Sequence, residues 1–551
     1  MFLKSISLYA KKTSRPVWIL AVFSVIFFFV YAYFPLTSPV RFVSPDETAN
    51  YFFARQFAKS TTLTVSEPLN EIAGGVIHPR NIGARGAILL PEGFIGVMVL
   101  WGSIAKVLGL WVVRLIVPLL AAIAPLTLYA VLRRVFDRRV ALIAALALFF
   151  VPSYWYYASR SMMNNLPLVV FLILTAWLGL RFYEHRRWST AVLFGLALGL
   201  TLLIRTGEIF WITLITLIAY WLARKRWSIK HLALSALVAL ICLTPFFIFN
   251  TRYFHNPITS ALSTNFVETP ATQTNISGIA KVGATLFPFG IHFDIAIRNL
   301  VNYGIVIFSW WGVFALIGYI REWRELLFAL RSAQTTESSP GRRVYLILYT
   351  VASVWLVLMY GSWSLREYED PNRLILGHSF LRYWLPIFVF GLPYFVIGFN
   401  RVITVFKRRW IQVGVASLLA LGVVSLTAIT VLGDPLYGLN KIKSDVKEYQ
   451  SINTKTVSLT EDNAIIIAGV ADKVFYPERR VIVQYEPNSA KYRQNIQLVA
   501  HRAPLYCYSI GLDDGCGGLA NAQLDNGELF TKLSEVTRFD NGAILFRVDI
   551  P

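Results

Sequence analysis

The stretch SPDETANYFFA, residues 44–54, closely follows an uncharged apolar run at 17–34 and carries two adjacent acids, Asp46 and Glu47. A run of about 18 apolar residues is long enough to cross the hydrocarbon core of a bilayer as a helix. The segment before this run carries basic residues and no acid. Because basic flanks stay in the cytoplasm, the sequence predicts a cytoplasmic N-terminus, a first membrane span and an acid pair just beyond it on the outer face.

The composition indicates an α-helical polytopic membrane protein. The chain has 551 residues, of which 56% are hydrophobic and 15% charged, and its mean hydropathy is +0.55. The net charge of +21 comes mostly from short Lys and Arg clusters between apolar runs, the positive-inside pattern, so we expect no nucleic-acid partner. The run at 17–34 could be a signal peptide, but no small-residue cleavage site follows it, so a retained anchor is the better interpretation.

Basic clusters such as RRVFDRR (133–139) and RFYEHRRW (181–188) mark the cytoplasmic side and fix the predicted topology. The apolar stretch 88–109 contains Pro91, Glu92 and Lys106, and we interpret it as a juxtamembrane helix within a first outer loop at 35–110. About eleven spans result, at 17–34, 111–132, 139–158, 165–182, 189–205, 208–223, 231–250, 301–320, 344–362, 384–400 and 411–432.

The last part of the chain, residues 433–551, predicts a separate domain from the membrane part at 1–432. It holds short β-type runs, AIIIAGVADKVFY (464–476), RVIVQYE (480–486) and GAILFRVDI (542–550), and LFTKLSEV (529–536) is interpreted as a helix. We expect a small α/β domain on the outer, extracytoplasmic face of the plasma membrane. Its two cysteines, Cys507 and Cys516, could close a small loop in an oxidising compartment, although their spacing leaves this open.

The acid pair has two possible roles. Ser44, Pro45 and Glu47 fit an N-cap, a first helical residue and the N3 position of a capping box, which makes Glu47 structural. Asp46 does not complete that box, and adjacent helix residues point about 100° apart, so the two carboxylates do not easily serve one site together. If one acid is the general base, geometry favours Asp46, and both are kept as candidate catalytic residues.

Charged residues also gather where spans reach the outer face. Arg205 ends an apolar run in TLLIRTGEIFW, Arg160 precedes Asn164, and Arg382 with Tyr383 precedes the run WLPIFVF. Ionisable groups at membrane level are candidates for function, and the arginine fork suits phosphate. The alternative is an interfacial anchor whose side chain reaches the headgroups. His78 and Arg85 of the first outer loop complete the substrate-binding candidates; no metal site or cofactor is predicted.

An ordered set of motifs resembles the GT-C glycosyltransferases, closest to their protein O-mannosyltransferase and lipid A aminoarabinose transferase branch. The set begins with RFVSPDETANYFFARQFA (41–58) after the first span and continues through GLTLLIRTGE (199–208), NTRYFHNPITS (250–260) and LRYWLPIFVF (381–390). It covers roughly residues 17–400. The resemblance implies a polytopic enzyme that transfers a sugar from a polyprenyl-phosphate carrier to an acceptor hydroxyl on a glycan, lipid or protein at the outer face.

The resemblance also implies roles for particular residues. Asp46 matches the general base, Arg205 a basic residue that meets the lipid phosphate, and Arg382 with Tyr383 a motif near the phosphate or donor sugar. The family's second outer loop often carries an acid, whereas this chain has SMMNN (161–165), so Asn164 or Asn165 would take a hydrogen-bonding role there. Direct attack by the acceptor would invert the anomeric centre.

Two other classes of protein stay open. A transporter or flippase for a lipid-linked glycan would use the arginines only to recognise headgroups, but such proteins often have paired halves and matching interrupted helices, which the sequence lacks. A non-catalytic membrane scaffold would leave Asp46 and the basic outer mouths unexplained. The identity of the sugar and of the acceptor does not follow from the sequence.

Overall fold

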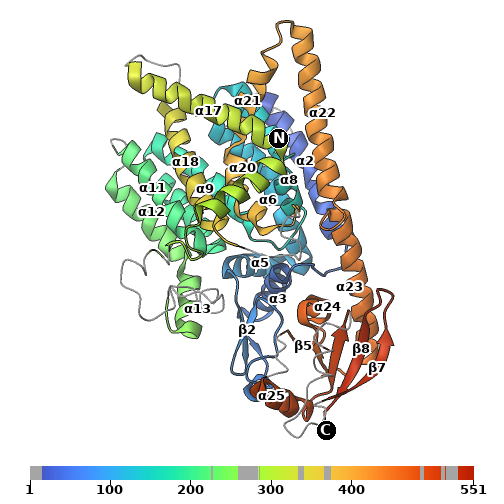
Figure 1. Cartoon of the computed structure of the whole chain (residues 1–551). Coiled ribbons are helices and arrows are strands. Elements are labelled where there is room, and N and C mark those ends of the chain that lie inside the picture. Colours follow the sequence, from blue (N-terminus) through green and yellow to red (C-terminus); the bar gives the residue numbers. More distant parts are fainter. Residues whose placement is uncertain are drawn as a thin grey trace, which may run out of the picture. The chain divides into compact units, whose positions relative to one another are not determined.

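The computed structural model describes residues 15–224, 228–257, 283, 286–332, 340–364, 374–483, 489–510, 516 and 531–550. The chain divides into two compact units (Figure 1). The helical unit contains the described residues of 15–34, 115–257 and 283–441, and the mixed unit those of 35–114 and 442–550. The first outer loop therefore belongs to the same unit as the C-terminal domain.

The helical unit is built from long apolar helices and bent helix pairs. Among the described residues, five helices are long and apolar enough to cross a membrane, or up to nine spans if each of four bent pairs is one span. The chain is thus a multi-pass membrane protein, while the count of eleven spans stays a prediction. The long helices are α2 (Arg15–Thr37), α6 (Val113–Leu132, extended to Leu110 by a short 3-10 turn), α9 (Asn165–His185), α18 (Pro340–Gly361) and α22 (Arg409–Gly433).

The bent pairs differ in how sharply they turn. The first two are α7 (Arg138–Leu148) with α8 (Pro152–Ala158), at 51°, and α12 (Ile229–Cys242) with α13 (Thr244–Phe254), at 47°. The other two pairs turn by more than a right angle. Helix α10 (Trp188–Ile204) meets α11 (Ile209–Ala223) at 115°. Helix α16 (Phe293–Asn299) continues through the π-helix Leu300–Val306 and meets α17 (Ser309–Ser332) at 109°.

Proline explains several of these interruptions. Proline lacks the backbone N–H that an inner helical position needs, so it begins a new helix, as Pro152 does in α8. The predicted span at 384–400 is likewise two short helices, α20 (Leu385–Phe390) and α21 (Leu392–Ile403), each with proline in its first turn. The Tyr345 hydroxyl donates to the Phe390 carbonyl at 2.7 Å, which satisfies an acceptor at the break.

Close packing of α17 on α21 depends on two glycines. A Cβ atom on Gly318 would stand 1.9 Å from the Tyr394 carbonyl oxygen, and one on Gly398 would stand 1.9 Å from the Phe314 carbonyl oxygen. The two backbones can approach this closely only because both positions lack a side chain.

The mixed unit contains a five-stranded sheet in the order β5-β4-β6-β8-β7. Strand β4 (Ile465–Ile467) is parallel to β5 (Arg480–Ile482) and β6 (Leu505–Ser509), whereas β8 (Ile544–Asp549) is antiparallel to β6 and β7 (Lys532–Arg538). Strands β7 and β8 lie side by side at the red end of the colour scale (Figure 1). Its C-terminal helices are α23 (Leu439–Leu459), α24 (Asp472–Phe475) and α25 (Ala490–Ala500).

The β-type runs predicted at 464–476, 480–486 and 542–550 contain β4, β5 and β8, although residues 484–486 lie outside the described part of the chain. The helix predicted at 529–536 is wrong, because residues 532–538 form β7. Leu533 and Val536, three residues apart as on a helix, are both partly buried because a β-bulge between Glu535 and Thr537 shifts the alternation of the strand.

The first outer loop supplies the other elements of the mixed unit. They are α3 (Pro45–Ser60), β1 (Val65–Ser66), α4 (Asn70–Ala73), β2 (Ile82–Arg85), β3 (Ile88–Pro91) and α5 (Ile95–Leu108). Helix α5 lies within the predicted juxtamembrane stretch 88–109 and is too short to span a bilayer. Residues Ile77 and His78 form isolated bridges with Ile482 of β5, so this loop adds to the edge of the C-terminal sheet.

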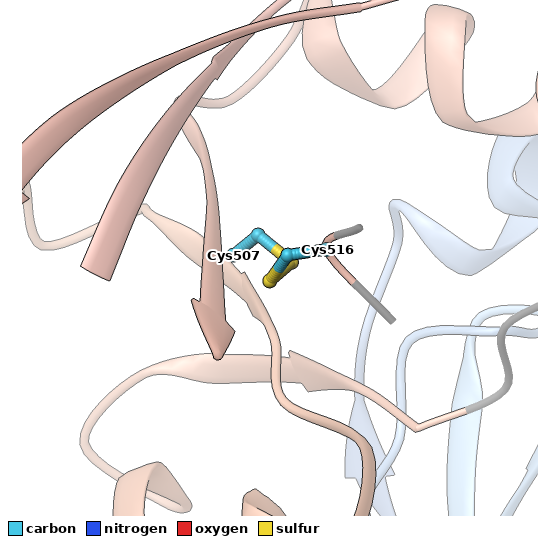
Figure 2. The surroundings of a disulfide bond; sticks show 2 residues. All are labelled: Cys507 and Cys516. Atoms are coloured by element: carbon cyan, nitrogen blue, oxygen red, sulfur yellow. A yellow bond between two sulfur atoms is a disulfide. The ribbon is translucent and has the colours of Figure 1, made fainter. Parts of the chain in front are cut away.

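A disulfide joins Cys507 of β6 to Cys516, which confirms the pairing that the sequence left open (Figure 2). Both cysteines are buried in the core of the C-terminal domain, next to Ile465, Ile496 and Val548. The bond ties Cys516 to the central strand of the sheet.

Candidate functional site

The helix α3 presents the acid pair at its first turn. Ser44 is the N-cap and Pro45 the first helical residue, as predicted, and the Thr48 N–H donates to the Ser44 carbonyl at 3.1 Å. The predicted capping box is wrong, however, since the Ser44 side chain makes no capping hydrogen bond. Glu47 is buried, with 3% of its surface exposed, and Asp46 is half-buried. Glu47 is therefore a buried acid, and the Ser44 side chain does not contribute its part of the predicted box.

Asn81 fixes the side chain of Asp46. Its Nδ2 donates to Asp46 Oδ1, across 35 residues of sequence. Asn81 has a φ of +61°, in the left-handed region that asparagine adopts more readily than most residues. Its carbonyl accepts from the Glu92 N–H at 3.2 Å. Asp46 thus receives an oriented amide donor from a residue with a fixed backbone.

In the helical unit, Arg205 lies at the sharp turn between α10 and α11. It is 4% exposed, and its guanidinium lies 3.0 Å from Glu208 Oε1. Glu208 also accepts from the Tyr360 hydroxyl at 2.7 Å and from Trp211 Nε1 at 2.6 Å. Two neutral donors and one guanidinium therefore surround this buried carboxylate, the arrangement that a desolvated charge requires.

Tyr383 connects Arg205 to Arg382. The Arg205 guanidinium carbon lies 5.1 Å from the centre of the Tyr383 ring, and that of Arg382 lies at the same distance. The Tyr383 ring also stacks on the ring of Tyr360, with 4.4 Å between the two ring centres. Tyr383 ends the short helix α19 (Ser379–Tyr383). The structure therefore brings Arg205 together with Arg382 and Tyr383, the pair that the sequence proposed as a separate motif. We name this group, with Glu208 and Tyr360, the arginine cluster.

The loop before α9 approaches the same cluster. The Asn165 side chain donates to the Arg382 carbonyl at 3.4 Å, and Arg382 lies 3.8 Å from the Met163 sulfur. Arg160 is buried and donates to the Tyr156 hydroxyl at 3.2 Å. Asn164 occupies the N-cap position of α9 but makes no capping hydrogen bond through its side chain. Of the two asparagines that the sequence proposed, Asn165 has the contact with the Arg382 segment.

His78 and Arg85 lie in the mixed unit. His78 Nδ1 lies 3.0 Å from the Pro79 carbonyl, and Arg85 is the last residue of β2. Asn81, which contacts Asp46, lies between them in sequence. These two candidates share a unit with the acid pair, whereas the arginine cluster lies wholly in the helical unit.

Sequence reasoning missed Glu208, Tyr360 and Asn81. Glu208 follows Arg205 by three residues in RTGE, a spacing that allows two side chains to meet at a helical turn, so a signal was present. Tyr360 is 152 residues beyond Glu208, and no local pattern marks it. Asn81 precedes a strand as an ordinary turn residue.

The chain has the GT-C fold, as its sequence motifs suggested. Two solved structures with this fold are similar over nearly its whole length. ArnT from Cupriavidus metallidurans is 15% identical, with 96% of this chain and 97% of that chain covered and a TM-score of 0.55. AglB, an oligosaccharyltransferase from Archaeoglobus fulgidus, is 14% identical, with 97% and 74% covered and a TM-score of 0.54.

Both of these proteins also have structures with bound ligands. One structure of the ArnT holds undecaprenyl phosphate, and the AglB structure holds an inhibitory peptide and a dolichol-phosphate. Residues 97–249 of this chain match the family model of dolichyl-phosphate-mannose-protein mannosyltransferases. No curated protein matches the chain by sequence.

Proposed function

We propose that the chain is a membrane glycosyltransferase. It moves a monosaccharide from a polyprenyl-phosphate carrier to a hydroxyl of a glycan, lipid or protein at the outer face of the plasma membrane. The observation that carries this proposal is the arginine cluster, two guanidinium groups against one tyrosine ring with a single buried carboxylate. The relatives that hold polyprenyl phosphates support it.

The charges of the cluster suit a phosphate. Arg205 and Arg382 each carry a positive charge and Glu208 a negative charge, so these three side chains together carry a charge of +1. Arginine is permanently charged, and its fork matches the oxygens of a phosphate. When a sugar leaves a polyprenyl phosphate, negative charge grows on the phosphate oxygens, and fixed positive charge stabilises that change.

Asp46 is the proposed general base. The acceptor hydroxyl oxygen attacks the anomeric carbon of the donor and forms a new C–O bond, while the bond from that carbon to the phosphate oxygen breaks. The hydroxyl proton passes to the Asp46 carboxylate, and the phosphate leaves with the bonding electrons. A single displacement of this kind inverts the anomeric centre. Asn81 Nδ2 donates to one oxygen of this carboxylate and so orients the Asp46 side chain.

The other candidates complete the proposal. Glu47, buried beside Asp46, is the second candidate acid. Arg160 and Asn164 of the helical unit would help to bind the donor. His78 and Arg85 of the first outer loop would contact the acceptor. The disulfide supports an oxidising compartment for the C-terminal domain, and hence an extracytoplasmic location with a cytoplasmic N-terminus.

The test is donor turnover in proteoliposomes. Purified protein would be reconstituted with a panel of undecaprenyl-phosphate monosaccharides and an envelope extract as acceptor, and released undecaprenyl phosphate would be measured. We expect release with at least one sugar and only when acceptor is present. Movement of the intact donor across the vesicle, with none consumed, would instead indicate a flippase.

The phosphate site has its own prediction. Arg205→Lys keeps the charge and the partner Glu208 but loses the fork, so we expect undecaprenyl phosphate to bind at least about tenfold more weakly. Arg181→Lys is the matched control, because Arg181 also lies over an aromatic ring, that of Trp177, but outside the arginine cluster. Equal dissociation constants for the two variants and the wild type would contradict the assignment.

A further inference from the structure

Residues 472–478 of the C-terminal domain contact helix α3 and the parts of the first outer loop beside it, entirely within the mixed unit. Asp472 pairs with Arg80 of the first outer loop. Arg41, ahead of α3, donates to the Val474 carbonyl at 2.8 Å and to Glu478 at 2.9 Å. Helix α3 itself packs there through a ring contact of 4.8 Å between Phe52 and Tyr476. We name residues 472–478 the anchoring segment.

The strongest of these contacts is that of Arg80 with Asp472. The Arg80 backbone N–H donates to Asp472 Oδ2 at 2.7 Å, while its Nε and terminal nitrogen donate to Oδ1 at 3.1 and 2.7 Å. The same side chain reaches the Val470 carbonyl at 2.6 Å. Asp472 is 1% exposed. Because one buried carboxylate holds both the main chain and the side chain of Arg80, the backbone at this residue has little freedom.

The residue that follows Arg80 is Asn81, the donor to Asp46. Its left-handed backbone is fixed on one side by the Arg80 contact and on the other by the hydrogen bond from the Glu92 N–H. A continuous path of contacts therefore runs from Asp472 through Arg80 and Asn81 to the Asp46 carboxylate. Its two ends lie 426 residues apart in the sequence, so only the folded C-terminal domain can complete it.

We propose that the C-terminal domain sets the position of the base through this path, with Asn81 and Asp472 as positioning residues. The inference rests on the proposed function, because it takes Asp46 as the general base. A base displaced by about 1 Å can slow a reaction by about a hundredfold, so orientation of this carboxylate matters to turnover. The domain is then a working part of the catalytic machinery.

A second ion pair offers a matched control. Glu67, also in the first outer loop and also buried, pairs with Arg480 of β5 at 2.8 Å. This contact likewise joins the loop to the C-terminal domain, but the path to Asp46 does not include it. Loss of either pair removes a contact between a buried acid and an arginine, while only loss of the Arg80 pair frees Asn81.

The experiment compares donor turnover by full-length variants in the proteoliposomes described above. Asn81→Gly removes the amide donor and keeps a residue that accepts positive φ. We expect Asn81→Gly and Asp472→Asn each to lower kcat by about tenfold or more, with the KM for the undecaprenyl-phosphate sugar unchanged. The double variant should lose no more than either single variant, because both act through one path. Glu67→Gln should keep kcat within about twofold of wild type.

Asp46→Asn, run in the same assay, separates the two claims. If Asp46→Asn is inactive while Asp472→Asn and Asn81→Gly turn over like Glu67→Gln, the positioning path is overturned and the assignment of the base stands. Additive losses in the double variant would also overturn the path. If Asp46→Asn keeps full activity, the assignment of the base fails, and the inference fails with it. Arg80→Gln breaks the same pair from its more exposed side and answers the question if Asp472→Asn does not fold.

Discussion

At the scale of single residues, the burial of Arg205 depends on the acid beside it. A buried arginine is tolerated when a carboxylate lies beside it, and Glu208 provides one at 3.0 Å. A bound phosphate would bring a second negative charge to the same guanidinium. Glu208 and the ligand therefore share one task, since each compensates the positive charge of the cluster.

This sharing predicts how Glu208→Ala behaves. Removing one partner of a buried pair costs about 3–5 kcal/mol, so the variant should unfold at a lower temperature than wild type. Undecaprenyl phosphate should then raise the unfolding temperature of the variant more than that of wild type, because it restores a negative charge. Thermal unfolding of detergent-solubilised protein with and without this lipid measures both effects.

Glu325→Ala is the control for that prediction, because its pair with Arg321 is largely exposed and such pairs contribute little. Its unfolding temperature and its response to the lipid should match those of wild type. Equal lipid-induced shifts in Glu208→Ala and wild type would show that the carboxylate and the phosphate act on different groups.

A pH-dependent contact lies in the C-terminal domain. The Tyr506 hydroxyl donates to Glu461 Oε2 at 2.7 Å. This hydrogen bond holds the pKa of Glu461 below its ordinary value, and burial together with the same contact raises the pKa of Tyr506 to about 12. The Glu461 contribution to stability is therefore lost as the pH falls through its lowered pKa. The Tyr506 contribution is complete below pH 10 and is lost as the pH rises toward 12.

Tyr506→Phe tests this pH dependence of the stability. The variant should be less stable than wild type at neutral pH, and the difference should shrink in acid below about pH 4 and in alkali above about pH 10. Thermal unfolding of both full-length proteins across this range gives the comparison. A difference that stays constant from acid to alkali would mean that the hydrogen bond makes no contribution of its own.

At the scale of elements, the sequence predicts where the helices lie better than where they break. Uncharged runs set the positions of the spans, and proline marks the start of α8 and α20. The break in the predicted span at 384–400 needs more than proline, since Tyr345 from α18 must reach the Phe390 carbonyl. Such tertiary contacts have no local signal. The same holds for β7, whose bulge forms only against β8.

The crossing of α17 and α21 gives a prediction at this scale. Gly398→Ala would place a Cβ atom 1.9 Å from the Phe314 carbonyl oxygen, so the helices must separate. We expect a loss of about 1–3 kcal/mol or more in stability, seen as a lower unfolding temperature. Gly422→Ala on α22 is the control, because a Cβ there meets nothing within 4 Å. If the two variants unfold at the same temperature, helices α17 and α21 do not pack this closely at Gly398 in solution.

At the scale of the whole molecule, the sequence was sufficient for the fold class and for three of the five residues of the arginine cluster. The basic clusters alone predicted that Arg205 and Arg382 lie at the outer ends of membrane spans. The structure brings both arginines to the ring of Tyr383. The contacts that complete each group are of long range. Asp472 meets Arg80 across 392 residues, which no periodicity or spacing reveals.

The central claim is that Asp46 removes the proton from the acceptor while other residues hold the lipid phosphate. Asp46→Asn measures it most directly, by comparing undecaprenyl phosphate binding with donor turnover in one preparation. The account predicts an unchanged dissociation constant for the lipid, an unchanged unfolding temperature and turnover at least about a hundredfold lower. Turnover equal to that of wild type would contradict the assignment of Asp46 as the base.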